Sequence, residues 1–417
     1  MTTIKQVYAY EGVANSVQLP EASLGVGRVA KKCWLNRNLA GMGAASFLSD
    51  LGHEMATAIL PGFLVSIGAS PAALGTIEGV ADAVSSFVKV GAGYASDKTG
   101  IQKPIAVFGY TLTGLAKGSF ALATSWLHVL AGRVVGWFGR GIRNPIRDAM
   151  LAASVEPESY GRAFGFHRAM DTAGAVLGPL VAVLLLKTFS FRQIFLVTLI
   201  PGLLSAVAFA TLVKVTANGP NHHLRFWRSL RDLPKRYKGF LAAVGIFGIG
   251  DFAHTLLILR AMQMLAPSLG TAKAGHVAIL LYVFHNVLYA VTAFPLGALG
   301  DRVSKRILLA VAYLISAAMG VGLVFPLTSF GYLALLFALG GIFIAMEDAL
   351  EAAIAAELLP PKLRGTGYGV LATVNGVGDF VSSIVVGALW VHLSPAAGFG
   401  YAAVLSVVGS VILLRGK

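Results

Sequence analysis

Two short patterns in this apolar sequence combine acidic and histidine side chains at helical spacing. The first lies in the stretch FLSDLGHEMATAILPGFL, where Asp50, His53 and Glu54 are three and four residues apart. Residues at that spacing share one face of a helix. Asp251 and His254 repeat the three-residue spacing later in the chain. Carboxylate and imidazole together suit a divalent transition-metal ion, and they also suit a proton relay because histidine titrates near neutrality.

The elements that must position these residues are long and apolar. Of the 417 residues, 56% are hydrophobic and 12% are charged, whereas soluble domains contain about 25% charged residues. The apolar runs are long enough to cross the ~30 Å hydrocarbon core of a bilayer. Twelve spans are predicted, at 38–67, 71–96, 104–124, 127–150, 162–186, 191–213, 240–266, 274–299, 307–326, 330–356, 365–393 and 396–414. The predicted fold class is therefore an all-α, polytopic membrane protein.

Many acidic residues lie inside these spans. Among the 19 acidic residues of the chain, the ten singled out are Asp50, Glu54, Glu78, Asp82, Asp171, Asp251, Glu347, Asp348, Glu351 and Asp379. Each would cost about 2.5–3.5 kcal/mol near the bilayer centre, so they must pair, be protonated or face water. Hydrogen bonds between packed helices are the simplest alternative to a functional site. Four further polar positions could complete a site, namely His285, Asn286, Asn375 and Asp379.

The positive charge of the chain is concentrated on one side of the predicted membrane. Net charge is +14, and the segment 214–239 alone holds seven lysines and arginines. The six loops predicted on the opposite side hold only Lys187, Arg192 and Lys273. This asymmetry predicts that both termini are cytoplasmic. The charge is attributed to topology and to anionic lipid headgroups, so nucleic acid is excluded as a partner.

The polar segment 214–239 separates two halves that resemble each other. GYASDKTGIQK at 93–103 follows the second span and GALGDRVSKR at 297–306 follows the eighth, with Asp97 and Asp301 204 residues apart. Parallel six-helix repeats with a site between them are a known transporter plan. The predicted organisation is a cytoplasmic tail at 1–37, a six-helix bundle at 38–213, a basic linker at 214–239 and a second six-helix bundle at 240–417.

These motifs resemble those of the major facilitator superfamily over residues 38–414. The family's loop signature, Gly-x-x-x-Asp-Arg/Lys-x-Gly-x-x-Arg/Lys, is matched by Gly93, Asp97, Lys98, Gly100 and Lys103, and more loosely by Gly297, Asp301, Arg302 and Arg306. The Gly-x-x-x-Gly-Pro ending of a motif found in many exporters is matched by Gly174, Gly178 and Pro179. Arg133 stands where a third motif has a proton-coupling arginine, although the spacing of the neighbouring glycines departs from that motif.

The resemblance implies a fold and a mechanism. The expected fold has twelve helices in two pseudo-symmetric bundles and works by alternating access. The first and seventh spans would line a central cavity, where the two Asp-x-x-His faces would confront each other. The loop residues Gly93, Asp97, Lys98, Asp301 and Arg302 would form gating contacts that exist in only one state.

Charged residues of the fourth and tenth spans suggest two further possibilities. Arg143 and Arg147 share one helical face, and the offset of 204 places Glu347 and Glu351 at the equivalent positions. Such opposed pairs predict a cytoplasmic gate. Alternatively, the arginines hold an anionic substrate, because arginine binds carboxylate and phosphate through two hydrogen bonds. The residues for that second role are Arg133, Arg140, Arg143 and Arg168.

These patterns predict a secondary active transporter that is not an enzyme, since no nucleophile elbow, Walker loop or metalloprotease helix is present. The expected substrate is a divalent transition-metal cation, bound by Asp50, His53, Glu54, Asp251 and His254 and exported in a proton-coupled cycle. The alternative is proton-coupled transport of a drug-like or anionic organic solute. We expect no cofactor and a monomer embedded in the lipid bilayer. The expected location is the plasma membrane, or the inner membrane of a bacterium.

Overall fold

The protein is built from helices throughout the part that the structure describes. The computed structural model describes residues 33–69, 71–214, 220–252 and 254–415, which belong to one compact unit. Within these ranges there are fourteen α-helices, three short 3-10 helices and no strand. The α-helices are α1 (Arg37–Ser66), α2 (Pro71–Thr99), α3 (Gln102–Gly118), α4 (Trp126–Ser154), α5 (Tyr160–Leu185), α6 (Phe191–Leu212), α7 (Phe226–Arg231), α8 (Lys235–Gly248), α9 (His254–Leu269), α10 (Thr271–Gly300), α11 (Lys305–Val324), α12 (Phe330–Leu358), α13 (Arg364–His392) and α14 (Pro395–Arg415).

The predicted spans correspond closely to these helices, with one exception. Eleven of the twelve coincide with one α-helix each, whereas the seventh is divided into α8 and α9. The break contains a glycine at Gly250, and two of its carbonyl groups are bound by side chains. Tyr401 donates its hydroxyl to the carbonyl of Ile249 at 2.9 Å, and Ser382 donates to the carbonyl of Asp251. These partners make a non-helical turn tolerable at membrane depth.

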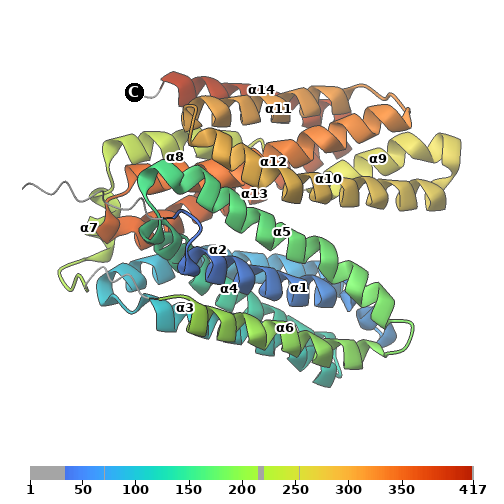
Figure 1. Ribbon diagram of the computed structural model, residues 1–417. Helices are drawn as coiled ribbons and strands as arrows, with labels where there is room; N and C mark the ends of the chain where they lie inside the picture. Colours follow the sequence, from blue (N-terminus) through green and yellow to red (C-terminus); the bar gives the residue numbers. More distant parts are fainter. Residues whose placement is uncertain (1–32, 70, 215–219, 253, 416–417) are drawn as a thin grey trace, which may run out of the picture. The chain divides into compact units, whose positions relative to one another are not determined.

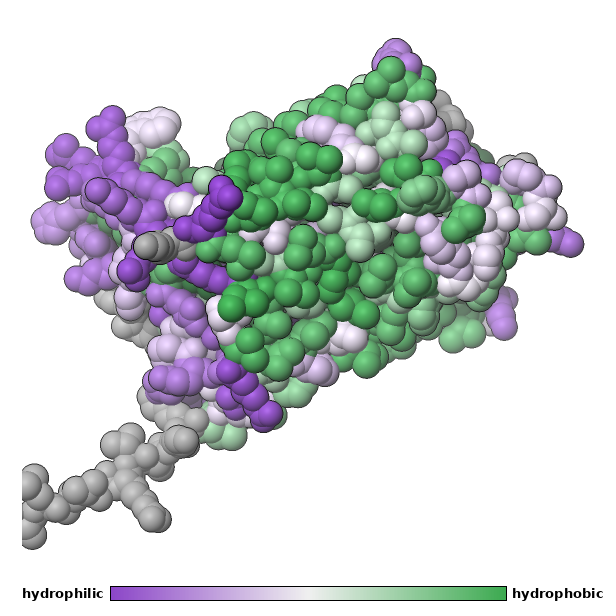
Figure 2. All heavy atoms as spheres, turned by 90° about the horizontal axis from the view of Figure 1, so that it is seen from above, coloured by the Kyte–Doolittle hydropathy of each residue, from purple (hydrophilic) through white to green (hydrophobic). Residues whose placement is uncertain are grey.

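The outer surface suits a bilayer. Within the described ranges, eight helices are long and apolar enough to cross a membrane by length and composition: α3, α5, α6, α10, α11, α12, α13 and α14. Large apolar side chains such as Phe87, Val291 and Val391 are exposed. Figure 2 shows an apolar face with hydrophilic residues gathered at its two ends, most densely at the end that holds α7. The protein is therefore a multi-pass membrane protein, and its interior charges lie on faces turned away from lipid.

Two six-helix bundles meet along two helix pairs. The first bundle comprises α1–α6 and the second comprises α8–α14, with α8 and α9 forming one span. Helix α5 packs on α10, and α2 packs on α13 (Figure 1). A Cβ atom on Gly161 would lie 2.1 Å from the carbonyl oxygen of Gly297, and one on Gly93 would lie 2.0 Å from that of Gly365. The backbones approach so closely that only glycine fits at these crossings.

The segment between the bundles contains a short helix. This helix is α7, and α8 begins at Lys235, five residues before the predicted boundary at 240. The backbone N–H of Asn221 donates to the carbonyl of Lys98 at 3.1 Å, which fixes this segment to the end of α2. We call this end of the bundles the linker side.

Some residues named in the sequence analysis lie outside the described part of the chain. They are residues 1–32 of the predicted tail at 1–37 and the side chains of Glu78 and Asp82.

Candidate functional site

Helix α4 carries a row of arginines on the face that contacts α1. Arg133, Arg140, Arg143 and Arg147 are separated by seven, three and four residues, so they lie on one side of the helix. Arg133, Arg143 and Arg147 are almost fully buried. Such charges persist inside a membrane protein only when they are paired or reach water. Their partners therefore define the polar interior of the first bundle.

Asp50 is the main partner of this row. One terminal nitrogen of Arg140 donates to both carboxylate oxygens of Asp50, at 2.9 and 3.1 Å. A terminal nitrogen of Arg143 lies 3.6 Å from the same carboxylate, and the other donates to Ser49 at 2.6 Å. The Asp50 side chain is 6% exposed and that of Arg140 is 14% exposed. Arg140 is thus the least buried member of this ion cluster.

A second ion cluster lies one turn further along α4, towards the linker side. Arg147 donates to Asp148 from its Nε at 3.1 Å and reaches Ser46 at 3.3 Å. A terminal nitrogen of Arg168 on α5 lies 3.6 Å from the other oxygen of Asp148. The hydroxyl of Ser46 lies 2.8 Å from Nε2 of His167. These contacts join α1, α4 and α5 into one network.

Trp137 lies between the arginines of α4. The guanidinium carbons of Arg133 and Arg140 lie 5.4 and 5.2 Å from its ring centre. The imidazole of His53 meets the indole edge-on, with ring centres 5.4 Å apart. Nε2 of His53 lies 3.8 Å from the carboxylate of Glu54, which is 31% exposed. The predicted face of α1 therefore contacts arginine and tryptophan of α4.

The second bundle has an acidic interior. Glu351 accepts hydrogen bonds from the Tyr313 hydroxyl at 2.7 Å and from the Asn375 amide at 2.8 Å. Asp348 accepts from the hydroxyl of Tyr289. Asp251 and Glu347 in the same bundle are partly buried, whereas Asp379 is exposed. The two bundles thus differ in charge, with arginines prevailing around α4 and carboxylates around α12.

The histidines of the second bundle form a stacked pair. The rings of His254 on α9 and His285 on α10 are 5.0 Å apart, and Tyr282 flanks both of them. His285 is 1% exposed. Asn286, another residue predicted for the site, follows His285 directly in the sequence and is partly buried. These contacts lie within α9 and α10, and the described residues show no contact between either histidine and His53.

The two signature aspartates connect the bundles at the linker side. Asp97 accepts from the backbone N–H groups of Gly365 and Thr366 at 3.0 and 2.6 Å. Asp301 accepts from those of Gly161 and Arg162 at 2.7 and 3.0 Å. Each carboxylate thereby meets the positively polarised N-terminus of a helix in the opposite bundle, α13 or α5. The neighbouring cations, Lys98 and Arg302, point elsewhere: Lys98 lies over the Tyr94 ring, and Arg302 is exposed.

Two structural expectations about these residues are wrong. Asp251 and His254 do not share a helical face, because Asp251 lies in the break and His254 is the first residue of α9. The expected gate between Arg143 or Arg147 and Glu347 or Glu351 is also not formed. Each arginine binds an aspartate of its own bundle, and Glu351 binds Tyr313 and Asn375 of its own bundle. The charges of these arginines and of Glu351 are therefore satisfied by partners within their own bundles.

The expected metal ligands are likewise not assembled. In the part of the chain that the structure describes, no group of three or more histidine, cysteine or acidic side chains is arranged to hold a metal ion. Asp50 is engaged by two arginines, whose positive charge opposes a cation at the same carboxylate. Asp251 and His254 belong to the other bundle. The arginines around Asp50 therefore disfavour coordination of a cation by this carboxylate.

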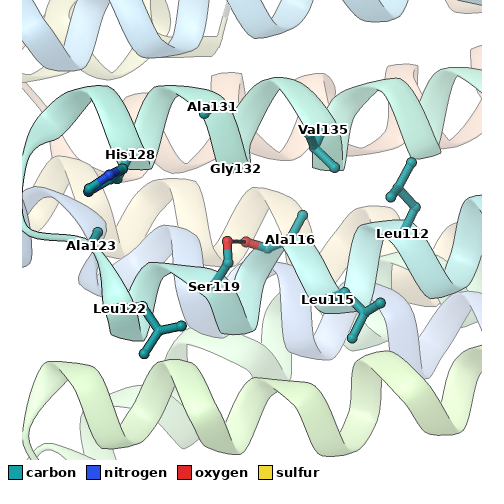
Figure 3. A pocket seen from close by; sticks show the side chains of 10 residues that line it. All are labelled: Leu112, Leu115, Ala116, Ser119, Leu122, Ala123, His128, Ala131, Gly132 and Val135. Atoms are coloured by element: carbon teal, nitrogen blue, oxygen red, sulfur yellow. Dashed lines mark hydrogen bonds between the residues drawn. The ribbon is translucent and has the colours of Figure 1, made fainter.

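A groove of about 440 Å³ on the outer side of α3, η1 (Ser119–Leu122) and α4 contains none of these residues (Figure 3). Its lining is mainly apolar and includes the exposed side chains of Leu115, Leu122 and Val135. The polar groups there are already bonded locally, since Ser119 donates to the carbonyl of Ala116 at 2.8 Å. This groove offers apolar contact but no unsatisfied polar group that would select a solute.

Sequence reasoning missed two important residues of the site. Asp148 was not singled out, although it follows Arg147 directly and the structure shows it shared by two arginines. Trp137 was also missed, although it stands four residues after Arg133 and three before Arg140. That spacing predicts contact on a helix surface. An apolar-looking residue inside a row of charges is the signal that would have identified it.

The protein consists of two similar six-helix bundles with charged residues in their interiors. The bundles are joined by Asp97 and Asp301, each bound to a helix N-terminus of the other bundle. Repeated bundles of this kind are typical of secondary transporters. The family model of the Major Facilitator Superfamily matches residues 42–268 and 261–417, and the chain belongs to that family. It is a transporter and not an enzyme.

Three known proteins illustrate the similarity. An uncharacterized MFS-type transporter of Methanocaldococcus jannaschii is 32% identical over 91% of this chain and 95% of its own length. A protein of Cupriavidus pinatubonensis named "Probable 4-methylmuconolactone transporter" is 27% identical over 85% and 83% of the two chains. The crystal structure of the transporter FucP in the outward conformation superposes with a TM-score of 0.75 at 14% identity, covering 91% and 98% of the two chains. The last comparison shows the fold alone.

Proposed function

We propose that this protein carries a small organic anion across the membrane together with a proton. The observation that supports the proposal is the pairing of Asp50 with Arg140, because Arg140 is the least buried cation of the cluster. A substrate carboxylate is chemically equivalent to the carboxylate of Asp50 as a partner for a guanidinium. Substrate and Asp50 therefore compete for one cation.

Protonation of Asp50 decides that competition. When a proton binds a carboxylate oxygen of Asp50, the attraction to Arg140 is lost and the guanidinium is released to bind the substrate anion. Asp50 is then neutral and Arg140 is paired with the substrate anion. The net charge of the cluster is therefore the same as before. Proton and anion thus favour each other's binding, which is the coupling that a symporter requires.

This coupling differs from the proton-driven export that the Gly-x-x-x-Gly-Pro pattern favoured. In the structure, a Cβ atom on Gly174 would lie 2.3 Å from the carbonyl oxygen of Phe47, and one on Gly178 would lie 2.8 Å from that of Leu51. Close packing of α5 on α1 therefore accounts for both glycines without reference to direction. We propose that net flux follows the proton gradient.

Alternating access is supported by the two aspartate latches, Asp97 and Asp301, which join the bundles at the linker side. We propose that both latches open when the linker side opens, while the helix pairs rock against each other. The basic residues of the linker favour a cytoplasmic position for this side. We further propose that the protein acts as a monomer in the plasma membrane, since α1 and α4 of one chain supply every residue of the proposed anion site.

A divalent metal cation is the weaker candidate substrate, because the arginines around Asp50 repel it. A protein named for transport of 4-methylmuconolactone, an organic compound, is among the relatives, which supports an organic substrate.

Proteoliposomes loaded with a pH-sensitive dye test the proposal. External addition of a transported carboxylate is expected to acidify the lumen, and Arg140→Gln is expected to abolish this signal. Arg228→Gln is the matched control, because Arg228 lies in the linker with 76% of its side chain exposed. Proton movement that is driven by Mn²⁺ or Zn²⁺, and not by any carboxylate, would contradict an anionic substrate. It would support a metal cation as the substrate instead.

A further inference from the structure

Trp137 is held in a fixed orientation by three neighbours. The guanidinium carbons of Arg133 and Arg140 lie within 5.4 Å of its ring centre, and His53 packs against it with an interplanar angle of 74°. Arg133 is itself anchored through a hydrogen bond to Thr57 at 3.1 Å. The indole therefore has little freedom to turn towards another partner.

Two ring nitrogens of this group have no hydrogen-bond partner among the described residues. Nε1 of Trp137 and Nδ1 of His53 are both buried and unbonded among the residues that the structure describes. His53 is only 3% exposed. A buried polar group without a partner is rare in native proteins, and each one needs an explanation. Both atoms belong to rings that contact each other beside Arg140, the cation proposed to receive the substrate.

We infer that Trp137, His53 and Arg140 form the recognition site for the carboxylate of the transported anion. The indole N–H of Trp137 donates to one carboxylate oxygen and Arg140 donates to the other, while His53 holds the indole in place. This inference rests on the proposed function and adds the residue that selects a carboxylate. Trp137 can donate but cannot accept a hydrogen bond, so it favours a ligand that presents only acceptors.

The state of Arg140 controls access to this site. In the structure the guanidinium carbon of Arg140 lies 5.2 Å from the indole ring centre while Arg140 binds Asp50, and the indole nitrogen is buried. On this proposal, movement of Arg140 away from Asp50 gives the ligand access to the indole N–H. The ligand then competes with Asp50 for Arg140 but meets no competitor for the indole N–H. Binding therefore adds a hydrogen bond at Trp137 that the empty site lacks. At Arg140, binding only replaces the contact with Asp50 by a contact with the ligand.

The chemistry distinguishes a carboxylate from its amide. A primary amide has the same shape but replaces one acceptor oxygen with an NH₂ group, which would face the N–H groups of Arg140 or Trp137. A site made of donors rejects such a ligand because a donor is left facing another donor. Benzoate and lactate, each paired with its amide, are therefore suitable probes.

The test follows the indole N–H directly in the full-length protein. The chain contains five tryptophans, so indole-¹⁵N labelling gives few signals, and loss of one in Trp137→Phe assigns Trp137. Benzoate or lactate is expected to move this signal downfield, and benzamide or lactamide is expected to leave it in place. Trp137→Phe keeps a ring but removes the N–H, so carboxylate affinity should fall about tenfold. Trp126→Phe, at the start of the same helix, should leave affinity unchanged.

Each outcome bears on the inference. A carboxylate-specific shift together with the loss in Trp137→Phe supports it. An equal response to the amides, or full affinity in Trp137→Phe while Arg140→Gln no longer binds, overturns the inference and leaves the proposed function intact. Binding of neither carboxylate to the wild-type protein, with no proton movement in the liposome assay, overturns both.

Discussion

The guanidinium of Arg140 on α4 donates to both carboxylate oxygens of Asp50 on α1, at 2.9 and 3.1 Å, and still leaves 14% of its side chain exposed. A fully exposed pair would contribute less than about 1 kcal/mol, whereas breaking a buried pair leaves an uncompensated charge. This pair joins α1 to α4 and is partly exposed on the Arg140 side. We propose that this partial exposure lets a ligand replace Asp50.

Asp50→Asn should separate anion binding from proton binding. The amide cannot hold Arg140 as an ion pair, so Arg140 is free at every pH. We expect carboxylate affinity to rise about tenfold near neutral pH and to lose its dependence on pH, as linkage between two sites requires. Calorimetric titration with benzoate between about pH 6 and about pH 8 measures both effects.

Glu54→Gln is the matched control for that substitution, since Glu54 lies on the same face of α1 but is 31% exposed. It should retain the pH dependence of the wild type. An Asp50→Asn protein in which affinity still rises as pH falls would show that another group carries the proton.

Arg147→Gln should destabilise the protein strongly. Arg147 is 1% exposed and binds Asp148 at 3.0 Å, so its removal leaves a buried carboxylate with one distant cation. Loss of one partner of a buried pair costs roughly 3–5 kcal/mol. Thermal unfolding in detergent should show a large fall in midpoint. Arg228→Gln removes an exposed ion pair with Asp232 and should cost less than about 1 kcal/mol. If the two variants unfolded at the same temperature, burial of the Arg147–Asp148 pair would not explain its contribution to stability.

Asp97→Asn and Asp301→Asn should each favour opening of the linker side. Each aspartate accepts from two backbone N–H groups at a helix end of the other bundle, and an amide oxygen is a weaker acceptor there than a carboxylate. A cysteine introduced at Ser96, which is 0% exposed, reports opening through its rate of maleimide labelling. The experiment uses Cys33→Ser as background because Cys33 is the single native cysteine.

Labelling should be faster in either aspartate variant than in the parent, and fastest in the double variant, because the two latches hold the same interface. A double variant with the labelling rate of the parent would show that packing alone keeps this side closed.

The orientation in the membrane is tested with reporters. A fusion after Arg225 in the linker should report the cytoplasm, and one after Thr188 between α5 and α6 should report the opposite compartment. The reason is the concentration of lysine and arginine in the linker. Reporters on the same side would contradict the arrangement of the first six spans.

The sequence predicted the architecture well because its signals are local. Hydropathy over about twenty residues locates a span, and the glycine and aspartate of the signature loops locate tight crossings. Family membership and the multi-pass fold followed from those signals and are confirmed. The break at Gly250 was missed because the seventh span remains apolar on average, and the groups that stabilise the break, Tyr401 and Ser382, lie far away in sequence.

The partners of the charged residues could not be predicted in the same way. Repeat alignment placed Arg143 opposite Glu347, but the rotation of α4 turns Arg143 towards Asp50. Helix rotation depends on packing across the whole bundle, so spacing along one helix does not determine it. The same limit explains why Asp251 and His254 were expected to form a face that the break disrupts.

The arginine row of α4 also bears on how the chain enters the bilayer during synthesis. A helix with four arginines, Arg133, Arg140, Arg143 and Arg147, would resist release from the translocon into lipid, at roughly 2.5 kcal/mol for each arginine near the membrane centre. Asp50 on α1 emerges from the ribosome about ninety residues before Arg140. We expect helix α1 to remain beside the translocon until α4 arrives, so that Asp50 neutralises Arg140 before the two helices enter lipid. Insertion into the bilayer would then use the same contact that we propose to be broken and re-formed in every transport cycle.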